Sequence, residues 1–219
     1  MYKCVVKRVF DLVLSGIAIV VLAIPMLIIA VVIKIDDPGP VLFKQKRVGK
    51  KKNGELTYFM IWKFRSMKMS TPHDTPTHLL ENPEQYITRV GRFIRKTSLD
   101  ELPQIYQVFT SRLSVVGPRP ALWSQEDLIA KREKYGANDI KPGITGWAQI
   151  NGRDELEIDV KAKFDGEYAA ALNAGRFRGL VMDMKCLFGT VVCVLKSEGV
   201  VEGGTGEMKK KAEREVTAK

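Results

Sequence analysis

The feature that most constrains this chain is an apolar segment close to its N-terminus. Residues Leu12 to Ile33 form 22 consecutive positions without a charged side chain, and Pro25 lies in the middle of them. A helix rises about 1.5 Å per residue, so this segment would extend roughly 33 Å, close to a hydrocarbon thickness of about 30 Å. It is therefore long enough to cross a membrane.

Basic residues lie on both sides of the segment and favour a different topology. Lys and Arg tend to stay on the cytoplasmic side, whereas a spanning helix would place one basic group outside. A helix that enters one leaflet and returns keeps both groups inside, and Pro25 supplies a break because it lacks an N–H. We therefore expect a re-entrant membrane helix over residues 1–35. The alternatives are a spanning anchor with a tolerated proline and a cleaved signal peptide, for which the segment is too long.

The rest of the chain predicts one folded domain. Residues 36–200 suffice for a single core, whereas residues 201–219, rich in Gly, Lys and Glu, predict a disordered tail. The net charge of +10 is compatible with an anionic membrane, a phosphorylated substrate or a nucleic acid. Three scattered cysteines lack the spacing of a disulfide framework or a metal site and fit a reducing compartment.

Residue patterns predict a β-hairpin and several amphipathic helices. Val41–Val48 and Glu55–Phe64 are rich in β-branched and aromatic residues, and Asn53-Gly54 between them is a turn signal. A helix is expected from Ser98, with Tyr106 and Phe109 among its core residues. Further helices are expected over residues 124–135, 156–172 and 178–196, and loops over 70–83 and 141–153. The last helix suits a core position or, alternatively, the headgroup region of a membrane.

The predicted fold class is therefore α+β and mainly helical. It combines an N-terminal re-entrant membrane helix, a small β-hairpin and amphipathic interfacial helices.

Two adjacent carboxylates, Asp100 and Glu101, stand at the predicted helix start that follows Arg95. Ser98 and Glu101 have the spacing of a capping box, which accounts for part of the motif without any function. A helix start also attracts phosphate, and an Asp kept ionised by nearby arginines can attack phosphorus. The motif therefore allows either a structural cap or a nucleophile for phosphoryl transfer.

Phosphoryl transfer requires neutralisation of the phosphate charge. Bidentate arginines and Mg²⁺ usually provide it. Arg119 is a candidate because Pro118 and Pro120 restrict its backbone, although a rigid turn with an exposed arginine explains the same pattern.

Four motifs occur in a distinctive order. They are Lys63-Phe64-Arg65-Ser66-Met67, Ser98-Leu99-Asp100-Glu101-Leu102-Pro103-Gln104, Gly117-Pro118-Arg119-Pro120 and Lys141-Pro142-Gly143-Ile144-Thr145-Gly146-Trp147-Ala148-Gln149-Ile150-Asn151-Gly152-Arg153. Together they resemble the bacterial sugar transferase family, the monotopic phosphoglycosyl transferases. The similarity extends to about Val200 and fits the short form, a catalytic core with one membrane segment.

The resemblance implies transfer of a sugar 1-phosphate from a UDP-sugar to polyprenyl (undecaprenyl) phosphate, with release of UMP. This would be the first membrane step in assembly of a capsule, exopolysaccharide, O-antigen or glycoprotein glycan. The resemblance also implies Mg²⁺, membrane lipids as partners, and a monotopic position on the cytoplasmic face of the bacterial inner membrane. Ile24 departs from the small hydroxyl residue that often precedes the membrane proline in this family, which leaves the sharpness of the bend open.

The resemblance also implies roles for individual residues. Asp100 would be the covalent nucleophile and, with Glu101, would bind the metal ion. The substrate-binding residues would be Lys63, Arg95, Arg119, Arg153 and, as an additional acid, Asp183.

Two other functional classes fit parts of the sequence. A membrane-tethered nucleic-acid-binding protein would explain the charge, but the chain lacks a dense basic stripe and a recognised motif, so we expect no nucleic-acid partner. A membrane scaffold would explain the amphipathic helices but not the Asp-Glu and Arg motifs. The sequence leaves open which sugar is transferred and the oligomeric state, a homo-oligomer included.

Overall fold

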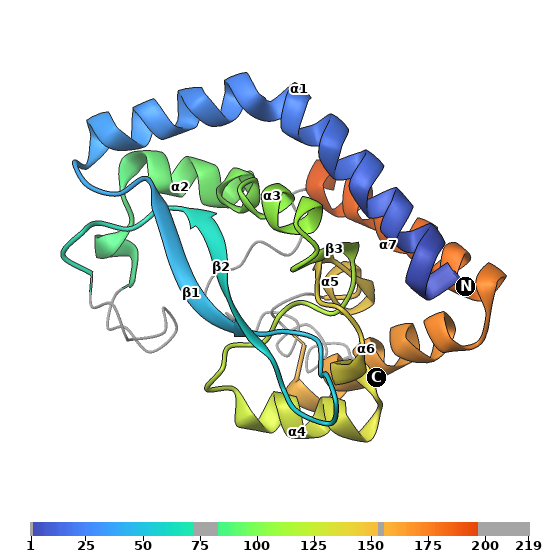
Figure 1. The fold of residues 1–219 in the computed structure, drawn as a ribbon. Coiled ribbons are helices and arrows are strands. Elements are labelled where there is room, and N and C mark those ends of the chain that lie inside the picture. Colours follow the sequence, from blue (N-terminus) through green and yellow to red (C-terminus); the bar gives the residue numbers. More distant parts are fainter. Residues whose placement is uncertain (1, 72–82, 153–155, 197–219) are drawn as a thin grey trace, which may run out of the picture.

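A long N-terminal helix arches over the other elements (Figure 1). This computed structural model describes residues 2–71, 83–152 and 156–196. A short π-helix, η1 (Tyr2–Val6), leads into α1 (Lys7–Asp36), which contains Pro25. The sequence predicted that Pro25 would break the membrane helix. Instead α1 continues through the proline and bends, as helices do where a proline removes one backbone hydrogen bond.

Both ends of α1 are attached to the same folded unit. At the N-terminal end, Lys7 Nζ lies 2.7 Å from Asp183 Oδ2, and Arg8 donates to the backbone oxygen of Val108 at 2.7 Å. At the C-terminal end, Asp37 forms an ion pair with Arg65. A helix that crossed a bilayer would carry these two ends to opposite sides of the membrane. The observed contacts therefore favour the re-entrant topology over a full span.

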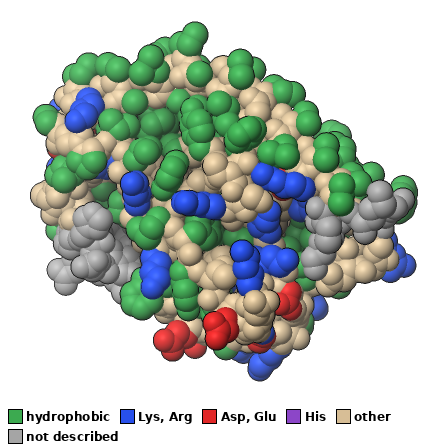
Figure 2. Space-filling view, viewed as in Figure 1, with side chains coloured by type: hydrophobic (Ala, Val, Ile, Leu, Met, Phe, Trp, Pro, Cys, Tyr) green, Lys and Arg blue, Asp and Glu red, His purple; other side chains and the backbone are tan. Residues whose placement is uncertain are grey.

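The outer face of α1 is apolar and uncovered. Within the described part of the chain, α1 is the one helix long and apolar enough to cross a membrane. Figure 2 shows hydrophobic side chains along the rim that α1 forms, and Lys and Arg side chains gathered below them. An apolar surface of this extent is stable only against another apolar phase, which indicates the bilayer. The exposed side chains include Val13, Ile17, Val20, Val21, Ile24, Leu27, Ile28, Val31 and Ile35.

The predicted hairpin is confirmed. Strands β1 (Leu42–Val48) and β2 (Tyr58–Phe64) pair antiparallel, with Phe43 opposite Lys63. The turn carries Asn53 at φ 51° and Gly54 at φ 85°, the left-handed pair that suits a tight hairpin.

The remaining regular elements are short apart from the last two helices. The segment 141–153, predicted as a loop, contains a strand and a one-turn helix, because β4 pairs in parallel with the distant β3 through only three residues. The elements are η3 (Pro83–Tyr86), α2 (Arg89–Lys96), η4 (Leu99–Glu101), α3 (Gln104–Phe109), β3 (Ser114–Val116), α4 (Glu126–Lys134), η5 (Ala137–Asp139), β4 (Gly143–Thr145), α5 (Trp147–Ile150), α6 (Ile158–Asn173) and α7 (Arg176–Lys196). Most of the loop predicted at 70–83 and the tail 201–219 lie outside the described residues.

The membrane helix is part of the hydrophobic core. Met26 and Ile33 of α1 are buried with Phe64 of β2 and Ile94 of α2, a set we call the α1 cluster. A second set of buried residues joins η1, β3, α6 and α7. Helix α1 therefore shares a hydrophobic core with the hairpin and α2.

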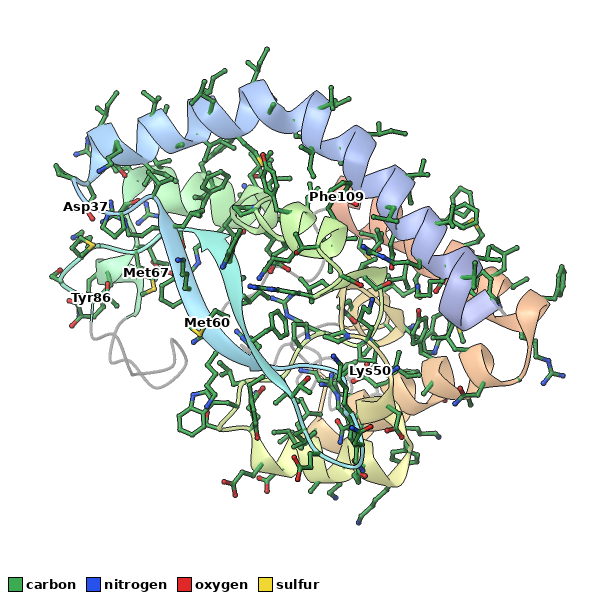
Figure 3. The ribbon with its side chains drawn as sticks, in the orientation of Figure 1. Asp37, Lys50, Met60, Met67, Tyr86 and Phe109 are labelled. Carbon is green, nitrogen blue, oxygen red and sulfur yellow. The ribbon has the colours of Figure 1, made fainter. Side chains whose placement is uncertain are left out.

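Helices α3 and α7 bury one side and expose apolar residues on the other. Tyr106 and Phe109 of α3, predicted to face the core, are exposed, and Phe109 lies under α1 (Figure 3). In α7, Asp183 and Cys186 are buried whereas Phe188 is exposed. The buried side confirms the predicted core position, and contact of the exposed side with the headgroup region stays a prediction. These exposed apolar faces are typical of interfacial helices.

Candidate active site

Asp100 and Glu101 lie in η4, a single 3₁₀ turn between α2 and α3. Each residue is 8% exposed. The predicted capping box is wrong: Ser98 adopts a left-handed conformation with φ 56°, and its side chain makes no capping hydrogen bond. The helix itself starts later, at Gln104. The backbone thus turns sharply at Ser98, and the two adjacent carboxylates follow a residue that does not cap the turn with its side chain.

Two cations from distant parts of the chain converge on this carboxylate pair. Lys63 Nζ lies 2.8 Å from Glu101 Oε1 and 3.4 Å from Asp100 Oδ2. Arg119 donates to both oxygens of Glu101, at 2.8 and 3.4 Å. Glu101 therefore carries most of these cation contacts, and Asp100 has one long contact, with Lys63. This difference leaves Asp100 the freer of the two carboxylates to react.

Burial raises the pKa of Asp100 above its usual value, and the charge of Glu101 acts in the same direction. The charges of Lys63 and, more weakly, Arg95 lower the pKa of Asp100, which shows that the structure brings Arg95 within electrostatic reach. The sequence predicted that neighbouring cations would dominate. The pKa of Asp100 is instead raised, because loss of hydration disfavours the charged form more than these cations favour it.

The loop that carries Arg119 is held from two sides. On the hairpin side, Val48 N donates to Ala121 O at 3.0 Å. On the other side, Gly117 N donates to Thr145 O at 2.7 Å. A Cβ atom at Gly143 would lie 2.1 Å from the backbone nitrogen of Gly117, so the close approach of these segments requires glycine there. The Gly-Pro-Arg-Pro motif and the 141–153 motif therefore form one support for the Arg119 guanidinium.

The carboxylate pair lies next to the membrane helix. Leu99 and Leu102 flank it in sequence, and both pack against the α1 cluster. Met26, a member of that cluster, is the residue after Pro25 in α1. Asp100 and Glu101 are thus fixed directly beside the element whose outer face is apolar.

Two predicted site residues lie elsewhere. Asp183 is 4% exposed and accepts hydrogen bonds from Tyr2 at 2.6 Å, Lys7 at 2.7 Å and Tyr168 at 2.7 Å. None of these partners belongs to the group around Asp100, so the structure does not bring Asp183 to that group. Arg153 lies outside the described residues.

The donor set suits Mg²⁺ in one particular way. Among the described residues, no three acidic, His or Cys side chains converge on a point. Mg²⁺ commonly binds through one or two carboxylates together with waters and substrate phosphates. Asp100 and Glu101 fit an ion that shares the phosphates of a bound substrate.

The chain belongs to the bacterial sugar transferase family, whose model matches residues 2–197. The match includes every described element, from η1 to α7.

Several relatives resemble the chain over most of its length. It is 40% identical over 192 residues to the UDP-glucose:undecaprenyl-phosphate glucose-1-phosphate transferase of Escherichia coli (strain K12), covering 84% of this chain but 39% of that protein. It is 39% identical to the exopolysaccharide production protein PSS of Rhizobium leguminosarum bv. phaseoli, covering 87% of this chain and 96% of the relative. The undecaprenyl-phosphate galactose phosphotransferase of Salmonella typhimurium is 35% identical, covering 88% and 41%. The chain thus spans less than half of the Escherichia coli and Salmonella proteins and nearly all of the Rhizobium protein.

Sequence reasoning missed the residues that support the site. Arg47 donates to Pro120 O at 3.1 Å and so helps to fix the Arg119 loop. The sequence around Arg47 gives no signal of that contact, because Pro120 is 73 residues away.

Proposed function

We propose that this protein transfers a sugar 1-phosphate from a UDP-sugar to polyprenyl phosphate and releases UMP. The observation that carries the proposal is the placement of the Asp100–Glu101 pair, which is buried among Lys63, Arg95 and Arg119 and flanked by leucines that pack on the membrane helix. A polyprenyl phosphate has its phosphate at the headgroup plane, and a UDP-sugar is soluble. A catalyst for both must lie at that boundary.

The first step forms a bond between Asp100 and phosphorus. A carboxylate oxygen of Asp100 attacks the β-phosphorus of the UDP-sugar, and the bond from that phosphorus to the bridging oxygen breaks. The electron pair of that bond leaves with UMP. Arg119 and Lys63 are placed to neutralise phosphate charge, and charge neutralisation is the main requirement of phosphoryl transfer.

The second step regenerates the carboxylate. An oxygen of polyprenyl phosphate attacks the same phosphorus, the Asp100–phosphorus bond breaks, and the products are a polyprenyl diphosphate sugar and free Asp100. Glu101 would orient Lys63 and Arg119 through the ion pairs described above. Such a product is the membrane-bound start of a surface glycan, in keeping with the exopolysaccharide name of one relative.

Mg²⁺ and the membrane side are part of the same proposal. Asp100 and Glu101 would hold Mg²⁺ together with the diphosphate, and the ion would supply further charge neutralisation. We place the protein on the cytoplasmic face of a bacterial inner membrane, because the basic residues at both ends of α1 favour that side. We expect no binding of nucleic acid, which titration with an oligonucleotide across a salt series would check.

Turnover and adduct formation test the proposal separately. Purified protein is incubated with a panel of UDP-sugars, Mg²⁺ or EDTA, and polyprenyl phosphate, and UMP is measured. We expect UMP release with at least one sugar and loss of release in EDTA. With donor but no lipid acceptor, intact-protein mass spectrometry should show one phosphosugar on wild-type protein and none on Asp100→Asn.

Matched controls distinguish chemistry from folding. Asp159→Asn alters an exposed carboxylate in α6 and should retain turnover and the adduct. Near-normal turnover of Asp100→Asn would exclude Asp100 as the nucleophile. Turnover without any adduct would favour direct transfer between the two substrates. If no UDP-sugar of the panel gives UMP release, a scaffold role would be the better explanation.

A further inference from the structure

Gln107 is a buried polar residue to which the proposed chemistry gives no role. It lies in α3, six residues after Glu101, and is 1% exposed. Its side-chain Oε1 accepts from Trp62 N at 2.9 Å, and its Nε2 donates to Met60 O at 2.7 Å. Figure 3 labels Met60 on the hairpin strand that this amide contacts. A helix side chain thus forms two hydrogen bonds with the backbone of β2.

The amide of Gln107 takes the place of a neighbouring strand. Backbone groups of alternate residues in a strand point to the same edge. Because Met60 O and Trp62 N bond to Gln107, they belong to the edge of β2 that faces away from β1. A carboxamide has an acceptor and a donor in one plane, as a peptide group does, so it can satisfy both groups at once.

The same strand carries Lys63, the residue after Trp62. Lys63 reaches Glu101 at 2.8 Å and Asp100 at 3.4 Å. These contacts close a ring. It runs from Glu101 along the chain to Gln107, crosses the amide to Trp62, and returns to Glu101 through the adjacent Lys63. Only two of its links are non-covalent, the amide contacts and the ion pairs. A change at the amide can therefore reach the ion pairs through the backbone of β2.

The base of this ring is rigid. The backbone oxygen of Gln107 accepts from Arg112 N at 2.9 Å and from Leu113 N at 3.0 Å, and the adjacent Val108 is fully buried. The end of α3 is also held by Arg8 of the membrane helix, which donates to the oxygens of Val108 and Phe109 at 2.7 Å each. Gln107 is therefore anchored to the core while its amide holds the strand.

We propose that Gln107 is a positioning residue that sets the distance of Lys63 from the Asp100–Glu101 pair and, through Lys63, the rate of phosphosugar transfer. The effect on rate rests on the proposed function, whereas the effect on geometry does not. Removal of the amide takes these partners from the part-buried N–H of Trp62 and C=O of Met60, so we expect the strand edge to shift towards water or another group.

A double-mutant cycle tests the effect on rate. UMP release is measured for wild type, Gln107→Leu, Lys63→Met and the double variant. We expect Gln107→Leu to lower kcat by about tenfold, since small displacements of a charged group near the reacting atoms are costly. In the Lys63→Met background the same substitution should have no further effect, because the residue through which it acts is gone. Equal factors in both backgrounds would overturn the proposal and indicate a general loss of structure.

Chemical labelling of Lys63 tests the geometry without turnover. Trace acetylation followed by peptide mass spectrometry gives the rate at Lys63 relative to Lys131, an exposed lysine in α4. We expect this ratio to rise several-fold in Gln107→Leu. In Gln107→Glu, which keeps the acceptor for Trp62 N, the rise should be smaller, and this variant serves if Gln107→Leu does not fold.

The control is Gln125→Leu. Gln125 also accepts a backbone hydrogen bond, from Leu122 N at 2.9 Å, but it is exposed. This variant should change neither kcat nor the labelling ratio. An unchanged ratio in both Gln107 variants would overturn the positioning role, whereas wild-type protein without turnover would overturn the proposed function alone.

Discussion

Two buried clusters of charge in this protein satisfy their carboxylates to different degrees. Around Asp183, one carboxylate receives three short hydrogen bonds, from Tyr2, Lys7 and Tyr168. Around Asp100, two adjacent carboxylates share Lys63 and Arg119, and the contact of Asp100 with Lys63 is 3.4 Å long. The first arrangement is complete, so it stabilises the fold. The second leaves one carboxylate with capacity for another partner, as a nucleophile or a metal ligand requires.

The comparison also distinguishes a structural acid from the acid that we propose to react. Asp183 is a lone acid in an apolar helix, and the family resemblance implied that it binds substrate. The structure gives it the task of joining α7 to the N-terminal end of α1. Burial alone therefore does not mark a reactive carboxylate, and the number and length of its contacts are more informative.

The largest effect on stability is expected from Asp183→Ala. This change leaves the Lys7 ammonium buried without its partner and should lower the free energy of unfolding by about 3–5 kcal/mol. Unfolding by denaturant in detergent, followed by fluorescence, measures the change. Asp159→Ala removes the acid of an exposed ion pair with Lys131 and should leave the free energy of unfolding nearly unchanged. Equal losses in the two variants would contradict a structural role for the Asp183 cluster.

The next prediction concerns access to the Asp183 cluster. Burial raises the pKa of the Cys186 thiol to about 12, and the charge of Asp183 acts in the same direction. The thiolate is the reactive form, and at pH 8 its population would be about a thousandfold below that of a thiol with the ordinary pKa. Alkylation at pH 8 with peptide mass spectrometry should label the partly exposed Cys193 first. Raising the pH should speed labelling of Cys186 as its thiolate population grows. Fast labelling of Cys186 at pH 8 would show that the cluster opens to water.

Arg119→Ala should reduce turnover by about a hundredfold with little change in stability. It removes the cation that we propose binds phosphate, together with its ion pair to Glu101. Arg119→Lys should restore part of the activity, since it returns the charge without the planar pair of donors. Measurement of kcat and of thermal unfolding for both variants checks this. A large loss of thermal stability in Arg119→Ala would make the Asp100 cluster structural as well.

The smallest effect is expected at Ser98. Its left-handed backbone, φ 56°, is strained for a residue with a side chain, so Ser98→Gly should be neutral or stabilise the fold by up to about 1 kcal/mol. Ser98→Val should destabilise it, because β-branched residues avoid that conformation. Thermal unfolding of the two variants measures the difference. A destabilised Ser98→Gly would instead indicate that the hydroxyl has a role the described hydrogen bonds do not show.

Local patterns were sufficient for some elements. The hairpin was predicted correctly because its strands are rich in β-branched and aromatic residues and its turn carries Asn53-Gly54. The helices at 124–135, 156–172 and 178–196 were close to α4, α6 and α7 because each is long enough for its spacing to be read. The motif resemblance supplied Lys63, Arg95, Asp100, Glu101 and Arg119, which the structure brings together.

Long-range contacts account for what the sequence did not predict. The left-handed Ser98 overrode a capping pattern that is convincing on its own. The three-residue strands β3 and β4 have no periodicity to detect, since their pairing depends on glycines that allow close approach. The direction of the Asp100 pKa depends on its burial, and the bond of Gln107 to β2 joins residues 45 positions apart.

The burial of Met26 and Ile33 with Phe64 and Ile94 has a consequence for how this protein can be handled. The lipid-facing segment is not a detachable tether, because its inner side forms one wall of the domain that carries the chemistry. Excision of residues 1–35 would strip that wall and expose Phe64 and Ile94 to solvent. We therefore expect truncated forms to aggregate, and amphiphiles that shield only the outer side of α1 to be the route to an active, water-dispersed enzyme.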